Sequence, residues 1–449
     1  MLYPEYQNLN DSRFDAAIKI PKDWGERKLK FLVSHNDEVL PESTDADYEI
    51  EYVDISSVDL VNGINAYETV SFEKAPSRAR RLARDGDTLV STVRTYLKAI
   101  ASVTNPPDNL VVSTGFAVIR PREEIDQGYL AYFLQNQNFV EQVVANSVGV
   151  SYPAINAADL VCIPAYFPRK IEEQQKIAAF LDYKTQQIDQ LIKKKKNLIE
   201  KLDEKRIAVI TQAVTKGLDK NAKLKPSGVD WLGDVPGGWK VRKLRFIGVC
   251  QNGINIGAEF FGRGDPFVSY GDVYNNKELP SSVKGLVQSS DSDKKAYSVE
   301  TGDILFTRTS ETIEEIGFSS VCMETIEDAV FAGFLIRVRP DANEISMKFS
   351  KYYFQNILLR AFFVKEMNLV TRASLSQDLL KKLPVLLPSI DEQIIIAKYL
   401  DEATSKTEKM VKKVQSAIDK LIEYRAAIVT SAVTGKIDVR EVEVPKEVA

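Results

Sequence analysis

The sequence predicts an α+β protein in which two mixed α/β domains stand in tandem repeat, each followed by a long helix with a coiled-coil pattern. Two observations predict this organisation. Two long helical patterns, Ile171–Gly217 and Ile390–Lys436, contain no proline and no glycine before their last turn. Segments of the first half of the 449-residue chain also return in the second half, at offsets of 215 to 220 residues.

Both helical patterns carry apolar residues at spacings of three, four and seven, which is typical of a coiled-coil seam. Each begins with an acidic Glu-Gln turn and ends at a glycine, as helix start and stop signals do. We expect the seam to consist of Ile177, Leu181, Ile188, Leu191, Leu198, Leu202, Val209 and Ala213 in the first helix, and of Ile396, Leu400, Ala403, Met410, Val414, Leu421, Ile428 and Ala432 in the second.

The two helices are copies of one another. At an offset of 219 residues, Leu202–Asp219 lies over Leu421–Asp438, and nine of the eighteen positions are identical. A shared heptad pattern would align apolar residues, but it would not also match Glu204 with Glu423. The helices therefore indicate a duplicated chain.

The repeat continues outside the helices, in short anchors that keep their order. Between these anchors the two units diverge, which favours one scaffold that presents two different binding surfaces. The matching anchors are Pro21-x-x-Trp24 and Pro236-x-x-Trp239, Gly86-Asp87 and Gly302-Asp303, Gly115–Pro121 and Gly333–Pro340, and Tyr129–Asn136 and Phe349–Asn356.

Short strands and helices are expected within each unit. Apolar, β-branched runs next to Gly-Asp or Arg-Pro predict strands, and amphipathic spacing predicts helices. The expected strands are Thr88–Val93, Phe116–Ile119, Ile304–Thr307 and Phe334–Val338, and the expected helices are Gln127–Asn138 and Met347–Leu359.

The composition excludes several classes of protein. The net charge of −4 argues against a protein that coats nucleic acid, although specific DNA binding needs only local basic patches. No run of about 18 apolar residues predicts a membrane span. The first residues have neither the basic nor the apolar region of a signal peptide, so we expect a cytoplasmic location.

Cysteine and histidine usage argues against a metal centre. Cys162, Cys250 and Cys322 are far apart in apolar contexts, so buried reduced thiols are expected. His35 is the only histidine, and one histidine cannot supply a His-based metal cluster or a Cys-His nucleophile pair with its neighbours. We therefore expect no metal ligands.

The sequence also predicts no catalytic residues. Asn105-Pro106-Pro107-Asp108 is close to the Asn-Pro-Pro-aromatic motif of adenine methyltransferases, but Asp108 cannot stack on a flipped base. A simple turn is the better interpretation of this segment. A phosphate-binding loop and a nuclease-like carboxylate and lysine set are absent from the sequence.

Basic clusters in the divergent parts are candidates for DNA contact. Arginine suits phosphates and guanine edges, and asparagine or glutamine suits adenine. For each arginine a solvated surface charge remains an alternative, and Lys193–Lys196 is equally well explained as a solvated helix face. The candidates are Arg78, Arg80, Arg81, Arg84, Arg94, Tyr96 and Lys98 in the first unit, and Arg263, Lys294, Lys295, Arg308 and Arg372 in the second.

The whole chain resembles the specificity subunit of type I restriction–modification systems. The most specific segments lead into the helices: Gly149–Asn156 through Pro168 to Glu173-Gln174, and Thr371–Leu375 through Pro388 to Glu392-Gln393. Ser151, Tyr152 and Thr371 in these segments, and Thr309 beside Arg308, are further candidate DNA-binding residues. The second segment departs from the usual Gly-x-x-x-Pro-x-Ile form.

The resemblance implies two target-recognition domains that each read one half of a split, asymmetric DNA site. It also implies two conserved helices that pair antiparallel, set the distance between the half-sites and dock two methyltransferase subunits. S-adenosylmethionine, ATP and magnesium are expected on partner subunits, with restriction and translocase subunits joining, and no cofactor is expected on this chain. The implied boundaries are 1–170 and 218–389 for the recognition domains, 171–217 and 390–437 for the helices, and 438–449 for a C-terminal tail.

Two other functions remain open at this point. A duplicated coiled-coil scaffold that binds only proteins would also explain the repeat and the missing active site. A nuclease or methyltransferase acting by itself is a third hypothesis. The scaffold hypothesis predicts no sequence-dependent DNA binding in the presence of methyltransferase partners. The enzyme hypothesis predicts catalytic turnover by the isolated chain.

Overall fold

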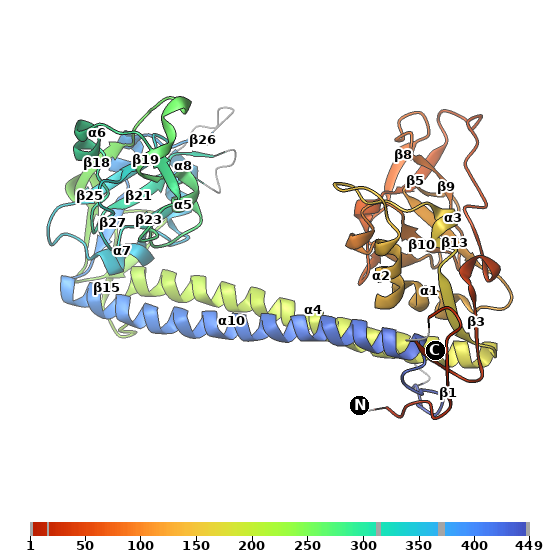
Figure 1. The fold of residues 1–449 in the computed structure, drawn as a ribbon. Helices are drawn as coiled ribbons and strands as arrows, with labels where there is room; N and C mark the ends of the chain where they lie inside the picture. The colour runs from red at the N-terminus through yellow and green to blue at the C-terminus, as the bar shows by residue number, and fades with distance from the viewer. Residues whose placement is uncertain (1–2, 16–17, 311–315, 367–372, 446–449) are drawn as a thin grey trace. The chain divides into compact units, whose positions relative to one another are not determined.

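The computed structural model describes residues 3–15, 18–310, 316–366 and 373–445. The chain forms two compact units, residues 1–196 with 415–449 and residues 197–414. In each unit a head of short strands and helices packs on segments of the two long helices (Figure 1). These helices are α4 (Ile171–Lys216) and α10 (Ile390–Val433), and each contributes one part to each unit. Neither of them, nor any other described helix, has the length and apolar character needed to span a membrane.

The first head contains two four-stranded sheets. One is antiparallel, with the order β11 (Ile100–Ser102), β10 (Thr88–Ser91), β13 (Phe116–Pro121) and β4 (Val33–His35). The other has the order β8 (Glu68–Ser71), β5 (Glu49–Val53), β12 (Leu110–Ser113) and β9 (Ala79–Leu82), with β5 and β12 parallel. The remaining elements are the strand pairs β1 (Leu9–Asp11) with β2 (Lys19–Pro21), β3 (Trp24–Lys28) with β14 (Pro164–Pro168) and β6 (Val58–Asp59) with β7 (Gly63–Ile64), and the helices α1 (Gln127–Gln135), α2 (Gln137–Ala145) and α3 (Ala157–Leu160).

The second head repeats the antiparallel sheet. Its order is β18 (Gly248–Asn252), β25 (Leu335–Pro340), β21 (Ile304–Thr307) and β23 (Ser319–Val321), the order of the first head read from the other edge. A three-stranded sheet of β20 (Gly285–Val287), β19 (Phe261–Val268) and β24 (Val330–Phe331) replaces the second sheet. The other elements are β15 (Leu224–Pro226) with β16 (Asp234–Pro236), β17 (Lys240–Lys243) with β27 (Pro384–Leu387), β22 (Thr309–Ser310) with β26 (Ala373–Ser374), and the helices α5 (Tyr270–Tyr274), α6 (Asp291–Ala296), α7 (Met347–Tyr353), α8 (Leu359–Glu366) and α9 (Gln377–Lys381).

The α+β class and the four predicted strands are confirmed, with small shifts at their ends. Each predicted helix after the sheet is wrong in extent, because the chain forms two helices there. In the first unit Asn136 has an extended backbone and its side chain accepts a hydrogen bond from the Phe139 amide. Asparagine favours such a cap, so the helix stops at Gln135 and α2 starts beyond it.

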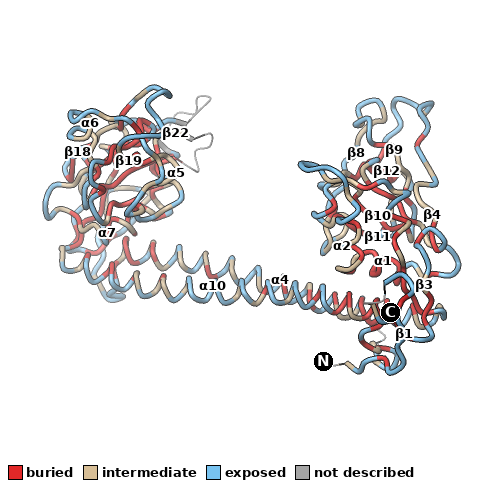
Figure 2. The backbone as a smooth tube through the Cα atoms, in the orientation of Figure 1, coloured by how far each residue is buried: buried red, intermediate tan, exposed pale blue. Residues whose placement is uncertain are grey.

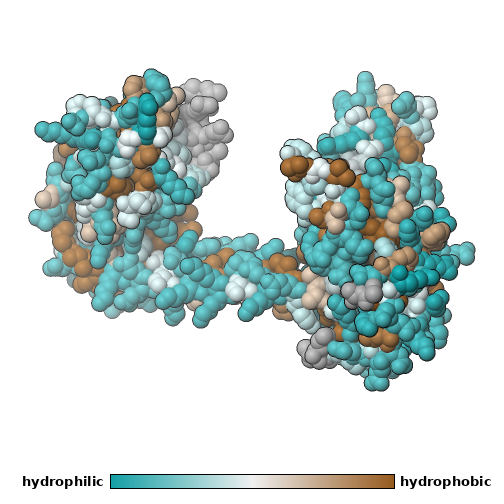
Figure 3. Space-filling view, in the orientation of Figure 1, coloured by the Kyte–Doolittle hydropathy of each residue, from teal (hydrophilic) through white to brown (hydrophobic). Residues whose placement is uncertain are grey.

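Buried residues gather in the sheets and on the faces that the helices turn toward them (Figure 2). The second unit has one cluster that joins its antiparallel sheet to α7, α8 and the ends of both long helices, with Trp239, Phe349 and Tyr353 at most 2% exposed. The visible face of the helical pair is mainly hydrophilic (Figure 3). Each head therefore rests on a narrow apolar face of helices that are otherwise solvated.

The repeated sequence anchors make the same contacts in both units. Trp24 Nε1 donates to Glu173 at 3.1 Å, and Trp239 Nε1 donates to Glu392 at 3.0 Å. These bonds join the entrance of each head to the first turn of the helix that follows it. The residues recur because the contact recurs.

A second repeated contact is an ion pair across the antiparallel sheet. Asp87 is 1% exposed and accepts two hydrogen bonds of 2.8 Å from Arg120. Asp303, also 1% exposed, accepts two of 2.7 Å from Arg339. The pKa of Arg120 is raised, chiefly by its hydrogen bond to Asp87. The Gly-Asp and Arg-Pro anchors thus mark one ion pair that each sheet is built around.

The two long helices run antiparallel in the first unit. Lys176 Nζ donates to the backbone oxygen of Arg440, and further along α4 Asp189 accepts from Arg425 Nε at 3.1 Å. Residue numbers therefore rise along one helix as they fall along the other. The expected antiparallel pairing is confirmed.

Most of the predicted seam positions are buried, and three of them are exposed. Leu191, Leu198 and Met410 were expected in the seam but are 46%, 43% and 43% exposed, so these predictions are wrong. Ala403 is half-buried while its neighbour Thr404 is buried. The buried seam positions are Ile177, Leu181, Thr185, Ile188, Ile192, Leu202 and Ala213 on α4 and Ile396, Leu400, Thr404, Ile418, Arg425, Ile428 and Ala432 on α10, with Val209, Val414 and Leu421 half-buried.

The misassignment of Leu191 has a local reason. Leu191 stands beside Ile192, and one step along a helix turns the side chain by about 100°. The seam takes the second apolar residue of this pair because Thr185, seven residues earlier, is fixed to a head. Tyr132 lies 3.1 Å from the Thr185 hydroxyl, as Tyr352 lies 3.2 Å from Thr404. A polar residue therefore occupies a seam position, which apolar periodicity does not identify.

Candidate nucleic-acid interface

In the first head the structure brings together two segments that are far apart in the sequence. The Arg94 guanidinium lies 4.6 Å from the centre of the Tyr152 ring, within the range of a cation–π contact. The Arg94 amide donates a hydrogen bond to the backbone oxygen of Pro153. This bond connects the loop that carries Tyr152 to the segment that follows strand β10. Ser151 is exposed beside Tyr152, and Tyr96 is 51% exposed. We call Arg94, Tyr96, Ser151 and Tyr152 the Arg94 cluster.

The backbone under this cluster is strained. Arg94 and Lys98 have φ values of 52° and 55° at the two ends of a short 3-10 helix (Thr95–Leu97). Residues other than glycine rarely adopt this left-handed region, and such positions concentrate at functional sites. Lys98 Nζ donates to Gln137 at 2.8 Å, so this predicted residue is held against α2.

The four arginines around β9 form a separate group, the β9 arginines, on an edge strand. Arg78 pairs with Asp54 at 2.8 Å and Arg84 pairs with Glu38, and both side chains remain more than half exposed. Arg80 stacks 4.7 Å over the Phe72 ring. The pKa of Arg81 is lowered because its side chain is desolvated, and within the described residues its Nε has no hydrogen-bond partner.

The turn at residues 114–115 contacts both the β9 arginines and the segment that leads to the Arg94 cluster. Arg81 donates to the backbone oxygen of Thr114, and the Thr92 amide donates to Gly115 at 2.8 Å. Thr92 directly follows strand β10, which leads to Arg94. The β9 arginines and the Arg94 cluster therefore lie on either side of the turn at residues 114–115.

The second head places its candidates differently. Arg263 is exposed on β19 between Gly262 and Gly264, whose φ values of 89° and 100° accompany a shift in strand register. Lys294, on α6, pairs with Asp265 of the same strand at 3.1 Å, and Lys295 is exposed beside it. The structure thus brings Arg263, Lys294 and Lys295 to the β19–α6 region.

The last candidates lie where β21 ends. Thr309 pairs with Ser374 in the β22–β26 ladder, and the Leu375 amide donates to the Arg308 backbone at 2.7 Å. The Ile155 amide donates to Thr92 in the same way in the first unit. Arg308 Nε is buried without a partner in the described part of the chain. Thr371 and Arg372 lie outside the described residues.

Some residues beside the Arg94 cluster were missed by the sequence reasoning. Leu97, Val148 and Val150 are 55%, 81% and 101% exposed, although apolar side chains of this size are usually covered. Contiguous exposed apolar side chains are typical of surfaces that bind another molecule. The sequence gives no periodic signal for them, because they lie in loops.

The described residues include no group of three or more His, Cys, Asp or Glu side chains arranged to hold a metal ion. Cys250 and Cys322 are buried, and burial is the largest cause that raises their thiol pKa values to about 11 and about 12. Cys162 is half-buried rather than fully buried. The heads carry exposed cationic, aromatic and amide side chains. Such side chains are suited to contact the phosphates and the base edges of a nucleic acid.

Comparison with known proteins gives a consistent result. The family model for the type I restriction modification DNA specificity domain matches residues 21–201 and 236–419. The EcoKI specificity subunit of Escherichia coli K12 is 24% identical over 71% of this chain and 68% of its own length. The MjaIX specificity subunit of Methanocaldococcus jannaschii is 26% identical over 94% of this chain and 95% of its own.

Solved structures share the fold. A chain from work on complex assembly and conformational transition of the type I R-M system has a TM-score of 0.73 and 22% identity, and the match covers 93% of this chain and all of that one. The HsdS subunit from Thermoanaerobacter tengcongensis has a TM-score of 0.51 with 22% identity, over 93% and 98%. Because the family model matches both repeats over most of their length, the chain belongs to the type I restriction–modification DNA specificity family, as a specificity subunit.

Proposed function

We propose that each head reads one half of an asymmetric, bipartite DNA site, and that the helix pair sets the distance between the halves. The observation that carries the proposal is that the structural contacts recur in both units, whereas the basic surfaces of the two heads differ. The Trp–Glu bond, the Asp–Arg pair and the Tyr–Asp–Thr contact occur in both units. The basic surfaces differ in sequence and in the elements that carry them, so the half-sites should differ.

The Arg94 cluster and the β9 arginines are the proposed DNA contacts of the first head. Arg80, stacked on an aromatic ring, and the exposed Arg78 and Arg84 can reach phosphates or base edges. In the second head the proposed contacts are Arg263, Lys294, Lys295, Arg308 and Thr309. A protein-only scaffold would not need two divergent basic surfaces, and the family match does not support that alternative.

The chain is proposed to act without chemistry of its own. Base methylation requires a base flipped into an enzyme pocket, and separate methyltransferase subunits with S-adenosylmethionine would supply that pocket. Two such subunits would dock on the helices, one for each repeat, and restriction and translocase subunits would join them. The chain then determines which adenine is methylated and which DNA is cut.

The test is a gel shift with methyltransferase partners on DNA that carries the host's methylated motif. Wild-type complex should shift this DNA far better than scrambled DNA. Alanine at all four β9 arginines should weaken binding, because each base-reading arginine contributes ~1–3 kcal/mol and each phosphate contact also steepens the salt dependence.

The matched control is Arg27→Ala, which removes another exposed arginine of the same unit that is paired with Glu124. Its complex should bind like wild type. If the fourfold variant also binds and methylates normally, the β9 arginines are a solvated surface. If wild-type complex does not distinguish the two DNAs, the chain does not read sequence.

A further inference from the structure

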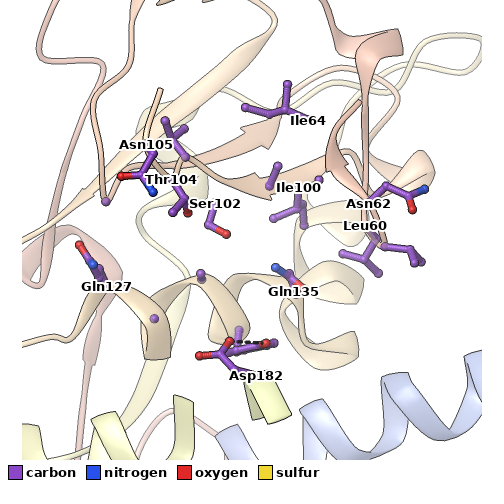
Figure 4. A pocket seen from close by; sticks show the side chains of 18 of the residues that line it. Leu60, Asn62, Ile64, Ile100, Ser102, Thr104, Asn105, Gln127, Gln135 and Asp182 are labelled. Atoms are coloured by element: carbon purple, nitrogen blue, oxygen red, sulfur yellow. Dashed lines mark hydrogen bonds between the residues drawn. The ribbon is translucent and has the colours of Figure 1, made fainter. Parts of the chain in front are cut away.

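The first unit contains a cavity of about 500 Å³ between its head and the long helices. The β6–β7 hairpin and β11 line one side, and α1, with Asp182 of α4 and Arg425 of α10, lines the other. Figure 4 shows Ile64 at the upper edge of this cavity and Asp182 at its lower edge, with Gln135 between them. This cavity has no part in the proposed DNA contacts.

The second unit has the equivalent cavity, of about 510 Å³, and a lysine lines it there. Lys351 Nζ lies 2.8 Å from Asp401 and 2.7 Å from Glu278, and 4.6 Å from the centre of the Tyr352 ring. Burial alone would lower the pKa of Lys351, but these two carboxylates raise it above its ordinary value. The lysine therefore remains charged and neutralises Asp401.

The first unit keeps the acceptors of this arrangement but lacks the cation. Asp182 and Tyr132 occupy the positions of Asp401 and Tyr352, and Tyr132 donates to Asp182 at 2.7 Å. The position of Lys351 is Ala131, which also lines the cavity. Among the described residues Asp182 has no ion pair, and Gln135 Oε1 is buried without a hydrogen-bond donor.

The pKa values of the two aspartates differ accordingly. Burial raises the pKa of Asp182, and repulsion from Asp126 adds to this effect. For Asp401 burial is again the largest cause and acts in the same direction, but the hydrogen bonds from Lys351 and Tyr352 and the lysine charges together outweigh it, so the pKa is lowered. Arg425 does not supply the missing charge at Asp182, because its guanidinium is 9% exposed and paired with Asp189 at 3.1 Å.

We propose that the cavity of the first unit is a binding site for an alkylammonium group. The carboxylate of Asp182 and Gln135 Oε1 would accept its N–H donors, and the face of Tyr132 would lie against the ammonium, as the Tyr352 ring lies against Lys351 Nζ. The group would be the side chain of a lysine on a docked partner subunit, or a free polyamine. Each provides the same ammonium on an unbranched alkyl stem.

The substitutions that test this site exchange the residues at one equivalent position of the two repeats. Ala131→Lys should place an internal lysine in the first cavity, and Lys351→Ala should open the second. Titration of the full chain with n-butylammonium should give one site in wild type, none in Ala131→Lys and two in Lys351→Ala. Asp182→Asn should weaken binding about tenfold or more, since it removes a charge-assisted hydrogen bond.

Tetramethylammonium is the matched control, because it carries the same charge but no N–H donor. It should bind wild type much more weakly than n-butylammonium does. Equal affinity of n-butylammonium for wild type, Ala131→Lys and Asp182→Asn would overturn the proposal. Because Ala131→Lys copies the Lys351–Asp401 pair of the second unit, it should also raise the thermal unfolding midpoint.

Two further arms distinguish the sources of the ammonium. If the ammonium comes from a lysine of a partner subunit, the Ala131→Lys variant should bind methyltransferase subunits about tenfold more weakly than wild type does. Spermidine should then have little effect on the assembly of wild type. A polyamine would bind the isolated wild-type chain more tightly than n-butylammonium and leave assembly of the variant unchanged. Neither arm measures DNA recognition, so this site can fail while the proposed function stands.

Discussion

Adding one heptad to both long helices should abolish methylation of the original site and favour a site with a longer spacer. Seven residues lengthen a helix by ~10.5 Å, close to three base pairs at ~3.4 Å each. Three base pairs also turn the duplex by roughly 100°, whereas a left-handed coiled coil keeps its seam facing its partner. The mismatch must be absorbed by bending or twisting the DNA, which costs free energy.

The insertion is best placed where the two compact units divide, after Lys196 in α4 and after Val414 in α10. Methylation would be measured on a series of spacer lengths with both half-sites held constant. The control replaces an existing heptad there with the inserted sequence, so that composition changes and length does not. An unchanged optimum in the lengthened protein would mean that the helices do not set the spacing.

Removing one arginine of the repeated Asp–Arg pair should destabilise the protein more than removing any surface arginine. Arg120→Ala leaves the Asp87 carboxylate, 1% exposed, without its bidentate partner. Loss of one partner from a buried pair costs about 3–5 kcal/mol, and the 25% exposure of Arg120 places this case at the lower end. Arg339→Ala should act alike on the second unit, where Asp303 is equally buried.

The free energy of unfolding would be measured by urea denaturation. Arg27→Ala is the matched control, because its pair with Glu124 is about half exposed on both sides and should contribute about 0–1 kcal/mol. Equal losses for Arg120→Ala and Arg27→Ala would show that the repeated pair has no special role in the sheet. A larger loss for Arg120→Ala explains why both repeats keep it.

The parts of the fold that the sequence predicted are those held by side chains that repeat. Trp24 and Trp239, or Asp87 and Asp303, recur because identical contacts require identical residues, so comparison of the two halves found them. The antiparallel order of the helices came from the family resemblance, and the structure confirms it through Asp189 and Arg425.

Other features depend on contacts that one sequence does not display. Leu191 and Ile192 are equally good seam residues by pattern, but only Ile192, seven residues after the Thr185 that Tyr132 contacts, is buried. The site residues remain proposals, because exposure and charge do not distinguish an arginine that reads DNA from one that is solvated. The pairing of Arg94 with Tyr152 needed the tertiary structure, since 57 residues separate them in the sequence.

The central claim is that each head reads its own half-site, and exchanging one head tests it most directly. Residues 30–150 would be replaced by the equivalent part of another specificity subunit, with both long helices unchanged. Single-molecule sequencing of methylated host DNA would then give the motif of each protein. We expect a new sequence in one half of the motif only, with the other half and the spacer retained. A change in both halves would contradict the central claim.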